Sequence, residues 1–145
     1  MVSLYRQGFR KIVVFNCHGG NWVLKPAMRE LNFSYPGLML IWTGPMSAEP
    51  PPEIHSGDGE TSAMLHFHPD LVREGREDFS PKYTQEYCDY VGYEAITETG
   101  VWGKPSAASA ERGAQRSQDA ARRQTEYIRG TFARLEELRR RQQGE

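Results

Sequence analysis

The chain has 145 residues, and its 18 Lys and Arg residues against 19 Asp and Glu residues give a formal net charge of −1. This balance argues against a dedicated nucleic-acid-binding protein, because such proteins usually carry a basic excess. No apolar stretch approaches the roughly 18 residues of a membrane helix, no signal peptide is recognisable, and two cysteines make no disulfide framework. We therefore expect one soluble, cytoplasmic domain over residues 1–145, with neither nucleic acid nor membrane as a partner.

The first elements along the chain are a helix end and a strand. Residues 2–9 read as the end of a helix, with Gly8 in the left-handed position that follows many helices. Residues 12–15, IVVF, form an uninterrupted β-branched and aromatic run. A run without alternation is typical of a parallel strand that is covered on both faces. The sequence therefore predicts a buried strand in this segment.

A helix and a second strand follow the loop NCHGG. Asn21 is expected to cap a helix that runs to about Phe33. The second strand, LMLIW, is expected at residues 38–42 after a Tyr-Pro-Gly turn. Strand, helix and strand with short links predict a right-handed βαβ crossover and an α/β fold. The inward face of the helix is expected to hold the side chains of Trp22, Ala27, Met28 and Leu31.

The rest of the chain reads as loops and further helices around a mostly parallel sheet. Residues 44–57 are rich in proline and glycine and predict a loop, and a helix is expected at residues 58–67. Residues 73–106 show no clear period and predict mostly loop, with a short helix near residues 83–90. A long helix is expected at about residues 107–142. Its apolar stripe comprises Ala114, Ala121, Ile128, Phe132, Leu135 and Leu138.

The loop after the first strand is a candidate binding site. Ligands of open α/β sheets bind beyond the carboxyl ends of the strands, and His18 lies three residues after Phe15. Gly19 and Gly20 have no side chains, so a ligand could approach the backbone closely. Imidazole is also a common ligand of zinc and similar ions. A tight strand-to-helix turn with an incidental histidine explains the same residues about equally well.

The second strand leads to another candidate segment, HSGDGETS at residues 55–62. Each candidate residue has a simpler explanation when taken alone. Glu60 falls in the first turn of a helix, where a carboxylate is favourable by about 0.3–1 kcal/mol through the helix dipole alone. His55 could be an ordinary loop histidine facing solvent. Together, however, His18, His55 and Glu60 at neighbouring strand ends indicate part of a metal-hydrolase site.

Two segments of the chain, taken together, resemble a known family. GFRKIVVFNCHGGNW, followed by HSGDGETSAMLHFHPDLV, resembles the creatininase family of metal-dependent amidohydrolases. That family carries an N-G-H-x-x-N motif and then an H-(A/G)-G-x-x-E-T-S motif. The segment TGVWGKPSAAS before the long helix is similar to the family's C-terminal part as well. The resemblance implies a three-layer α/β fold and a hydrolase of amide, cyclic amide or formamide C–N bonds.

The resemblance also implies roles for individual residues. The position of His18 binds one ion of a two-metal centre of zinc, manganese or iron, and the position of Glu60 binds the other. The position of His55 lies beside the small-molecule substrate and handles protons, with Gly19 and Gly20 on the substrate side. Creatininase itself has a glutamate at the position of Gly20, so creatinine is not the expected substrate. A formamide hydrolase and a peptide-trimming enzyme remain open.

Several positions depart from the family pattern. Cys17 replaces the usual glycine, and Ser56 replaces a common alanine. Family members begin with a strand that ends in Glu-x-His, followed by a metal-bridging aspartate, and no such element precedes His18. The chain therefore resembles the C-terminal half of the domain. We expect either an enzyme completed by a homo-oligomer or by a separate chain with the N-terminal half, or a non-catalytic fragment or subunit.

Two further features have simpler interpretations. His66 and His68 stand at i and i+2 on the expected helix and point apart, so they are not expected to bind a metal ion. Trp102, in the segment GVWG, could line a pocket. An aromatic side chain in such a loop more often covers the edge of the core, and we expect that role here.

Overall fold

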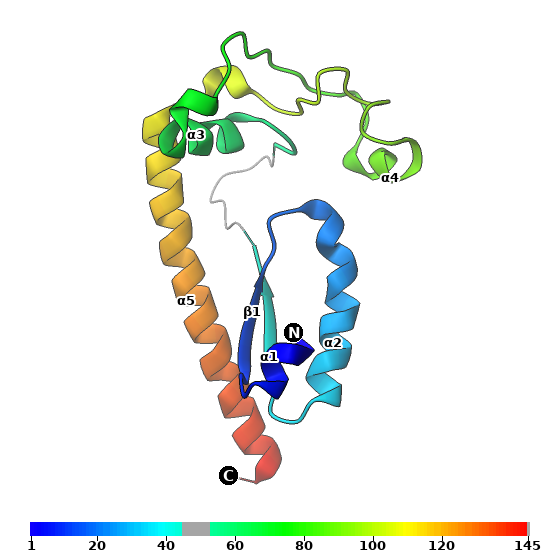
Figure 1. The fold of residues 1–145 in the computed structure, drawn as a ribbon, viewed down its shortest axis with the longest axis vertical. Coiled ribbons are helices and arrows are strands. Elements are labelled where there is room, and N and C mark those ends of the chain that lie inside the picture. Colours follow the sequence, from blue (N-terminus) through cyan, green and yellow to red (C-terminus); the bar gives the residue numbers. More distant parts are fainter. Residues whose placement is uncertain (45–52, 145) are drawn as a thin grey trace. The chain divides into compact units, whose positions relative to one another are not determined.

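The computed structural model describes residues 1–44 and 53–144, and much of the expected loop at residues 44–57 lies outside this range (Figure 1). The described chain divides into two compact units. The first unit comprises residues 1–46 and 120–145, and the second unit comprises residues 47–119. The elements are α1 (Val2–Arg6), β1 (Lys11–Phe15), η1 (Gly19–Val23), α2 (Leu24–Ser34), β2 (Met39–Thr43), α3 (Asp58–Phe67), η2 (Pro69–Leu71), η3 (Gln85–Tyr87), α4 (Cys88–Val91), η4 (Pro105–Ala107) and α5 (Ala110–Gln143).

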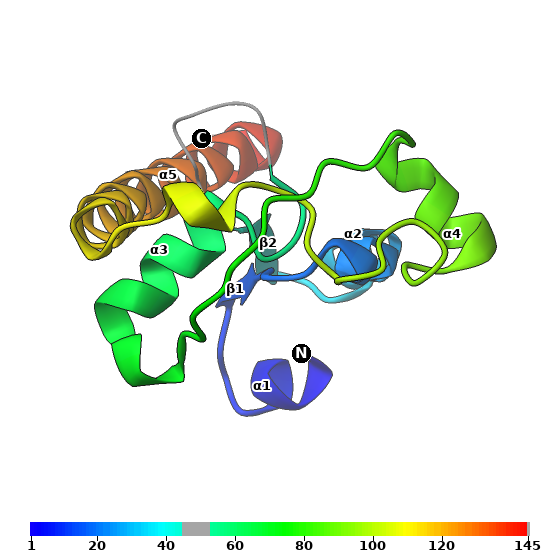
Figure 2. The same cartoon turned by 90° about the horizontal axis from the view of Figure 1, so that it is seen from above.

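The first unit is a βαβ crossover covered by helices on both faces. β1 and β2 are parallel, with a register that runs from Lys11 opposite Met39 to Phe15 opposite Thr43. Both strands lie within one residue of the predicted positions, and the predicted α/β class is confirmed. Helix α2 covers one face of the strands and the C-terminal part of α5 covers the other (Figure 2). The predicted left-handed glycine after the first helix is also present, since Gly8 has φ +100°.

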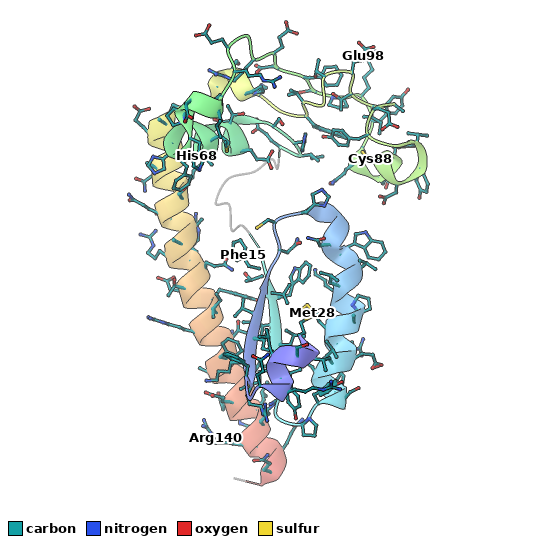
Figure 3. All side chains as sticks on the ribbon, in the orientation of Figure 1. Phe15, Met28, His68, Cys88, Glu98 and Arg140 are labelled. Atoms are coloured by element: carbon teal, nitrogen blue, oxygen red, sulfur yellow. The ribbon has the colours of Figure 1, made fainter. Side chains whose placement is uncertain are left out.

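Two small apolar clusters hold these layers together. Burial of apolar side chains is the main favourable contribution to folding, at about 25 cal/mol per Å². Figure 3 shows Met28 between α2 and the strands. The cluster under α2 contains the buried side chains Ile12, Met28, Leu38 and Leu40. The cluster under α5 contains Met39, Ile41 and Phe132, with Val13, Ile128 and Leu135 packed against them.

The start of the α2 region corrects the sequence prediction. Asn21 does not cap the helix, because a 3-10 turn at Gly19–Val23 precedes α2 and the side chain of His18 caps that turn. The 3-10 turn changes the helical phase, so Trp22 is 63% exposed and Ala27 is exposed as well. Met28 is buried as expected, and Leu31 packs against the same cluster.

Helix α5 confirms only part of its predicted stripe. Ile128, Phe132 and Leu135 pack on the sheet, whereas Ala121 is exposed and Leu138 is 54% exposed. Ala121 belongs to a series with a strict seven-residue spacing, which drifts by about 20° per heptad on a straight helix, so it turns away from the contact face. The buried polar residue Gln124 lies on this face instead and donates a hydrogen bond to the Thr43 hydroxyl.

The outer edge of β2 is bonded to side chains instead of a further strand. The Asn32 side chain on α2 accepts a hydrogen bond from the Leu40 N–H and donates one to the Leu40 C=O, each at 2.8 Å. Asn32 thus takes the place of one residue of a neighbouring strand. A cavity of about 530 Å³ lies beside this edge, lined by residues of α2, β2 and α5 that include Phe33, Trp42 and Leu138.

We predict that Asn32→Leu lowers the free energy of unfolding by about 2 kcal/mol, because both backbone groups of Leu40 then lose their partner. Urea unfolding followed by circular dichroism measures this change. Phe33→Leu, at a neighbouring side chain that is 79% exposed, is the matched control and should have little effect. Equal stability of the two variants would contradict a role for Asn32 in closing the edge.

The second unit confirms the predicted helix at residues 58–67 and contains η3 and α4 where a short helix was expected near residues 83–90. The first turns of α5 approach α3 closely, since the Ser109 N–H donates to the Ser62 hydroxyl at 3.1 Å. Ser62 itself is fully buried. Among the helices of the described residues, none combines the length and apolar character needed to cross a membrane.

Candidate active site

His18 lies in the first unit, in the loop directly after β1, as the sequence predicts. Its backbone is extended, and its Nδ1 atom accepts a hydrogen bond from the Gly20 N–H at 3.1 Å. A Cβ atom at Gly20 would lie 3.2 Å from this nitrogen, which explains why glycine suits the position. A neutral imidazole that accepts on Nδ1 carries its proton on Nε2. To bind a metal ion, His18 must therefore release the Gly20 N–H, because the ion takes either Nδ1 itself or Nε2 after the proton has moved to Nδ1.

His55 and Glu60 lie together at the N-terminus of α3 in the second unit. His55 forms an antiparallel bridge with Trp102, in which the Trp102 N–H donates to the His55 C=O at 2.8 Å. Glu60 reaches back to the loop, and its Oε2 atom accepts a hydrogen bond from the Ser56 N–H at 2.6 Å. Ser56 has φ +53°, a left-handed conformation that is uncommon for residues other than glycine. The second oxygen of Glu60 has no protein hydrogen bond among the described residues.

Tyr93 belongs to the same cluster and was missed by the sequence analysis. Its ring contacts the His55 ring edge-on, with centroids 5.4 Å apart, and lies 6.1 Å from the Trp102 ring. Its hydroxyl is buried and has no hydrogen-bond partner in the described part of the chain. Burial raises the pKa of the Tyr93 phenol, and the nearby Cys88 and Glu60 raise it further. No helical or strand period marks this segment, so only tertiary structure reveals the contact.

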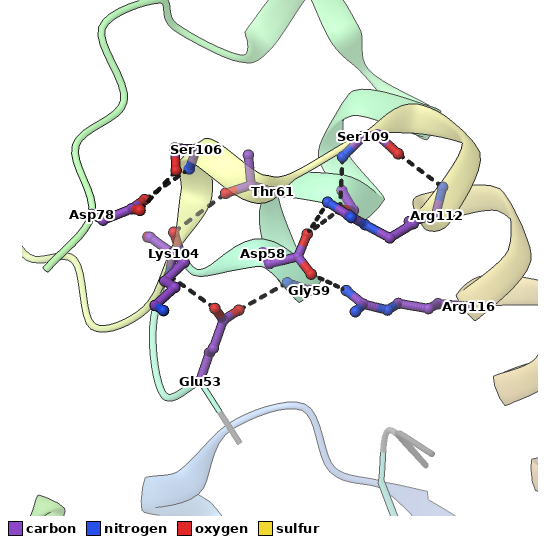
Figure 4. A network of polar contacts seen from close by, with 12 residues as sticks. Glu53, Asp58, Gly59, Thr61, Asp78, Lys104, Ser106, Ser109, Arg112 and Arg116 are labelled. Atoms are coloured by element: carbon purple, nitrogen blue, oxygen red, sulfur yellow. Dashed lines mark hydrogen bonds and ion pairs between the residues drawn. The ribbon is translucent and has the colours of Figure 1, made fainter. Parts of the chain in front are cut away.

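A network of polar contacts frames the loop that carries His55 (Figure 4). The Glu53 carboxylate accepts hydrogen bonds from the Gly59 N–H at 3.1 Å and from the Lys104 N–H at 2.8 Å. It thereby binds a free N–H group at the start of α3 and joins this helix to the loop after Trp102. The two backbone segments that pair at His55 are therefore fixed relative to α3.

Asp58 connects the start of α3 to α5. Its carboxylate accepts a hydrogen bond from the Ser62 hydroxyl at 2.9 Å and pairs with Arg112 at 3.0 Å and Arg116 at 2.8 Å. Burial by itself raises the pKa of Asp58, but the Ser62 hydrogen bond and the two guanidinium groups outweigh it, so the pKa is lowered. The ionised form is therefore the one that the folded state favours.

We predict that Asp58→Asn lowers the free energy of unfolding at pH 7 by about 1–3 kcal/mol, because a half-buried, hydrogen-bonded charge pair is lost. A lowered folded-state pKa contributes stability above the unfolded value of about 3.9, and this stability is lost as the pH falls through the folded-state pKa. The free energy of unfolding, measured by urea titration, should thus change less between pH 7 and a pH below 4 for the variant than for the wild type. The exposed pair of Glu137 and Arg141 supplies the control, Glu137→Gln, which should behave like the wild type.

Comparison with known protein families assigns the chain to a family. The family model for creatininase, described as creatinine amidohydrolase, matches residues 1–128. The chain belongs to the creatininase family. Comparison with curated proteins found no match.

Solved structures of creatininase-like proteins share the fold. A protein from Bacteroides fragilis NCTC 9343 assigned as a creatinine amidohydrolase is 29% identical, with a TM-score of 0.71. The match covers 88% of this chain and 56% of that chain. A creatininase variant with one tryptophan replaced by phenylalanine is 26% identical, also with a TM-score of 0.71, over 90% of this chain and 59% of that chain. The chain therefore spans less than two thirds of the length of these structures.

The donor groups of this creatininase-family chain fall into two sets. His18, Gly19 and Gly20 lie in the first unit, and His55 and Glu60 lie in the second. Within residues 1–44 and 53–144, no three His, Cys, Asp or Glu side chains are placed to hold one metal ion. His66 and His68 are therefore not part of such a group either. Zinc sites use three or four protein ligands. The described residues thus make no complete metal centre, and the convergence of His18 with Glu60 stays a prediction.

Proposed function

We propose that the chain contributes part of the active site of a metal-dependent amidohydrolase, which hydrolyses a C–N bond of a small molecule. The bond is an amide, a cyclic amide or a formamide. The observation that supports this proposal is the cluster at the start of α3, where the His55 ring contacts the Tyr93 ring and the Glu60 carboxylate binds the Ser56 N–H of the same loop. A histidine, a carboxylate and a hydroxyl are groups that can transfer protons or bind a metal ion during hydrolysis.

Each residue has a role in this proposal. His18 and Glu60 hold divalent ions of zinc, manganese or iron, together with ligands supplied from outside the described residues. Such ions, when bound, lower the pKa of water and polarise a carbonyl group. His55 transfers a proton to the leaving nitrogen, since its ring is positioned by Tyr93 and its backbone by Trp102. Gly19 and Gly20 leave room for the substrate beside His18.

The remaining ligands come from a complementing segment in this proposal. We define the complementing segment as the part of the Bacteroides fragilis protein that this chain does not cover. The match covers 56% of that protein, so this part is the other 44%. In this proposal it corresponds to the N-terminal half of the family domain. In the cell, the same contribution could come from a homo-oligomer or from a separate chain.

A second candidate function is a non-catalytic subunit of a creatininase-type assembly. The observation that favours it is the lack of three metal ligands in one place among the described residues. Such a subunit would keep the βαβ unit and the long helix α5 for packing. It would bind no metal ion in any mixture.

A reconstitution experiment separates the two functions. The chain, the complementing segment and their mixture are each incubated with zinc or manganese and with a panel of formamides, cyclic amides and short peptides. The proposal predicts turnover by the mixture and little or none by either part, because a two-metal centre needs ligands from both. Creatinine should be a poor substrate in this panel, because Gly20 stands where creatininase has a glutamate. A mixture without hydrolytic activity on any of these substrates would favour the non-catalytic subunit.

Tyr93 gives a prediction that separates stability from catalysis. Tyr93→Phe removes a buried hydroxyl without a partner in the described residues, so the free energy of unfolding should stay equal or rise by about 1 kcal/mol. If the hydroxyl donates to the substrate, kcat of the mixture should fall by about tenfold or more. Urea unfolding and steady-state kinetics measure the two effects. Lower stability with unchanged kcat would assign Tyr93 a purely structural role.

A further inference from the structure

The two outer edges of the sheet in the first unit differ. In a parallel ladder, successive residues direct their backbone groups alternately to the two sides of the strand. The Met39 N–H donates to the Arg10 C=O, and the Asn16 N–H donates to the Thr43 C=O, each at 2.7 Å. The backbone N–H and C=O groups of the even-numbered residues of β1 therefore point toward β2. The backbone groups of Lys11, Val13 and Phe15 lie on the outer edge of β1, and those of Leu38, Leu40 and Trp42 lie on the outer edge of β2.

The outer edge of β2 is already satisfied by side chains. Asn32 bonds both backbone groups of Leu40. The Arg139 guanidinium donates to the Leu38 C=O, and the Tyr127 hydroxyl lies 3.4 Å from the Trp42 C=O. A strand that entered here would have to displace three side chains. The burial of β2 agrees with a closed edge, because four of its five residues are buried.

The outer edge of β1 is open in the described residues. No hydrogen bond from another part of the described chain reaches the backbone groups of Lys11, Val13 or Phe15. Only Ile12 of this strand is buried, and the Phe15 side chain is 52% exposed. The run KIVVF nevertheless has the composition of an interior parallel strand. An apolar strand with unpaired backbone groups is a template for pairing with another strand.

We propose that the outer edge of β1 is the docking edge for a β-strand of the complementing segment. Main-chain hydrogen bonds to Lys11, Val13 and Phe15 would extend the sheet to at least three strands and cover the exposed side of β1. The length of the relatives supports this occupant, because 41–44% of their chains lies outside the match with this chain. The proposal rests on the assembly described under the proposed function. Hydrogen exchange tests it without any turnover, so failed docking and failed catalysis are distinguishable.

The test compares amide exchange of the chain alone and with the complementing segment. In the chain alone, the amides of Val13 and Phe15 should exchange rapidly, whereas those of Ile12 and Val14 should be protected by β2. Adding the segment should slow exchange at Val13 and Phe15 by at least about tenfold. A fusion with the segment placed before Met1 raises the effective concentration to about the mM range, so weak affinity cannot hide docking.

Val13→Pro and Val13→Ala form a matched pair of variants. Both remove the packing of the Val13 side chain, but only proline removes the outward N–H and places its ring on the edge. We expect the alanine variant to bind the segment nearly as the wild type does and the proline variant to bind at least about 30-fold more weakly. Circular dichroism checks that both variants fold. Equal binding of the two folded variants, or protection of the Leu40 edge in place of Val13, would overturn the assignment, as would self-association through β1 that the segment does not displace.

Discussion

Gly113→Ala should destabilise the second unit by about 4 kcal/mol, the largest effect on stability that we expect from a single methyl group. Gly113 lies in α5 where this helix meets α3 backbone to backbone. A Cβ atom at this position would lie 1.9 Å from the Ser62 C=O oxygen and 2.6 Å from its carbon. Because the obstacle is backbone, the two helices must separate. Separation would weaken the hydrogen bond from the Ser109 N–H to Ser62 and the ion pair of Asp58 with Arg112.

The same helix provides the control. Gly130 also lies in α5, and a Cβ atom there would meet no atom within 4 Å. Alanine is preferred over glycine in a helix interior by about 1 kcal/mol, so Gly130→Ala should stabilise the protein slightly. In urea unfolding, the two variants should therefore change the free energy of unfolding in opposite directions, although each adds the same methyl group. A stabilising Gly113→Ala would show that α3 and α5 do not touch at this point.

His55→Ala should lower kcat of the mixture with the complementing segment by about 10²–10⁴-fold, the range expected for loss of a proton-transferring group. The variant should still fold, because the bonds between His55 and Trp102 are made by backbone atoms. Its zinc content should equal that of the wild type, since His55 is not a ligand in this proposal. His68→Ala is the control, because His68 is exposed at the C-terminal end of α3. Unchanged kcat in His55→Ala, measured under saturating substrate, would remove His55 from the mechanism.

Local patterns predicted most of the secondary structure. The runs IVVF and LMLIW gave both strands to within one residue, and the helix at residues 58–67 was found at its predicted bounds. These elements could be predicted because their signals lie within the segments themselves: uninterrupted apolar residues, a turn, and a proline after the helix. The family motifs are local in the same sense, and the family match over residues 1–128 confirms the family that they indicate.

The contacts that the sequence did not predict depend on which distant segments meet. Asn32 bonds to Leu40 only because the crossover brings α2 beside β2, and Gly113 is needed only because α5 reaches the backbone of α3. Tyr93 meets His55 through a segment without any periodic pattern. His18 could be predicted as a residue of the loop after β1, but its role as the cap of the 3-10 turn depends on the local backbone path.

The measurement that tests the central claim most directly is the zinc content of the mixture of chain and complementing segment after equilibrium dialysis. We predict about two ions per complex for the wild type, well below one ion for the chain alone, and a clear loss in both His18→Ala and Glu60→Gln. Such a loss would show that the imidazole after β1 and the carboxylate of α3 serve one metal centre. The same zinc content in the wild type and both variants would contradict it.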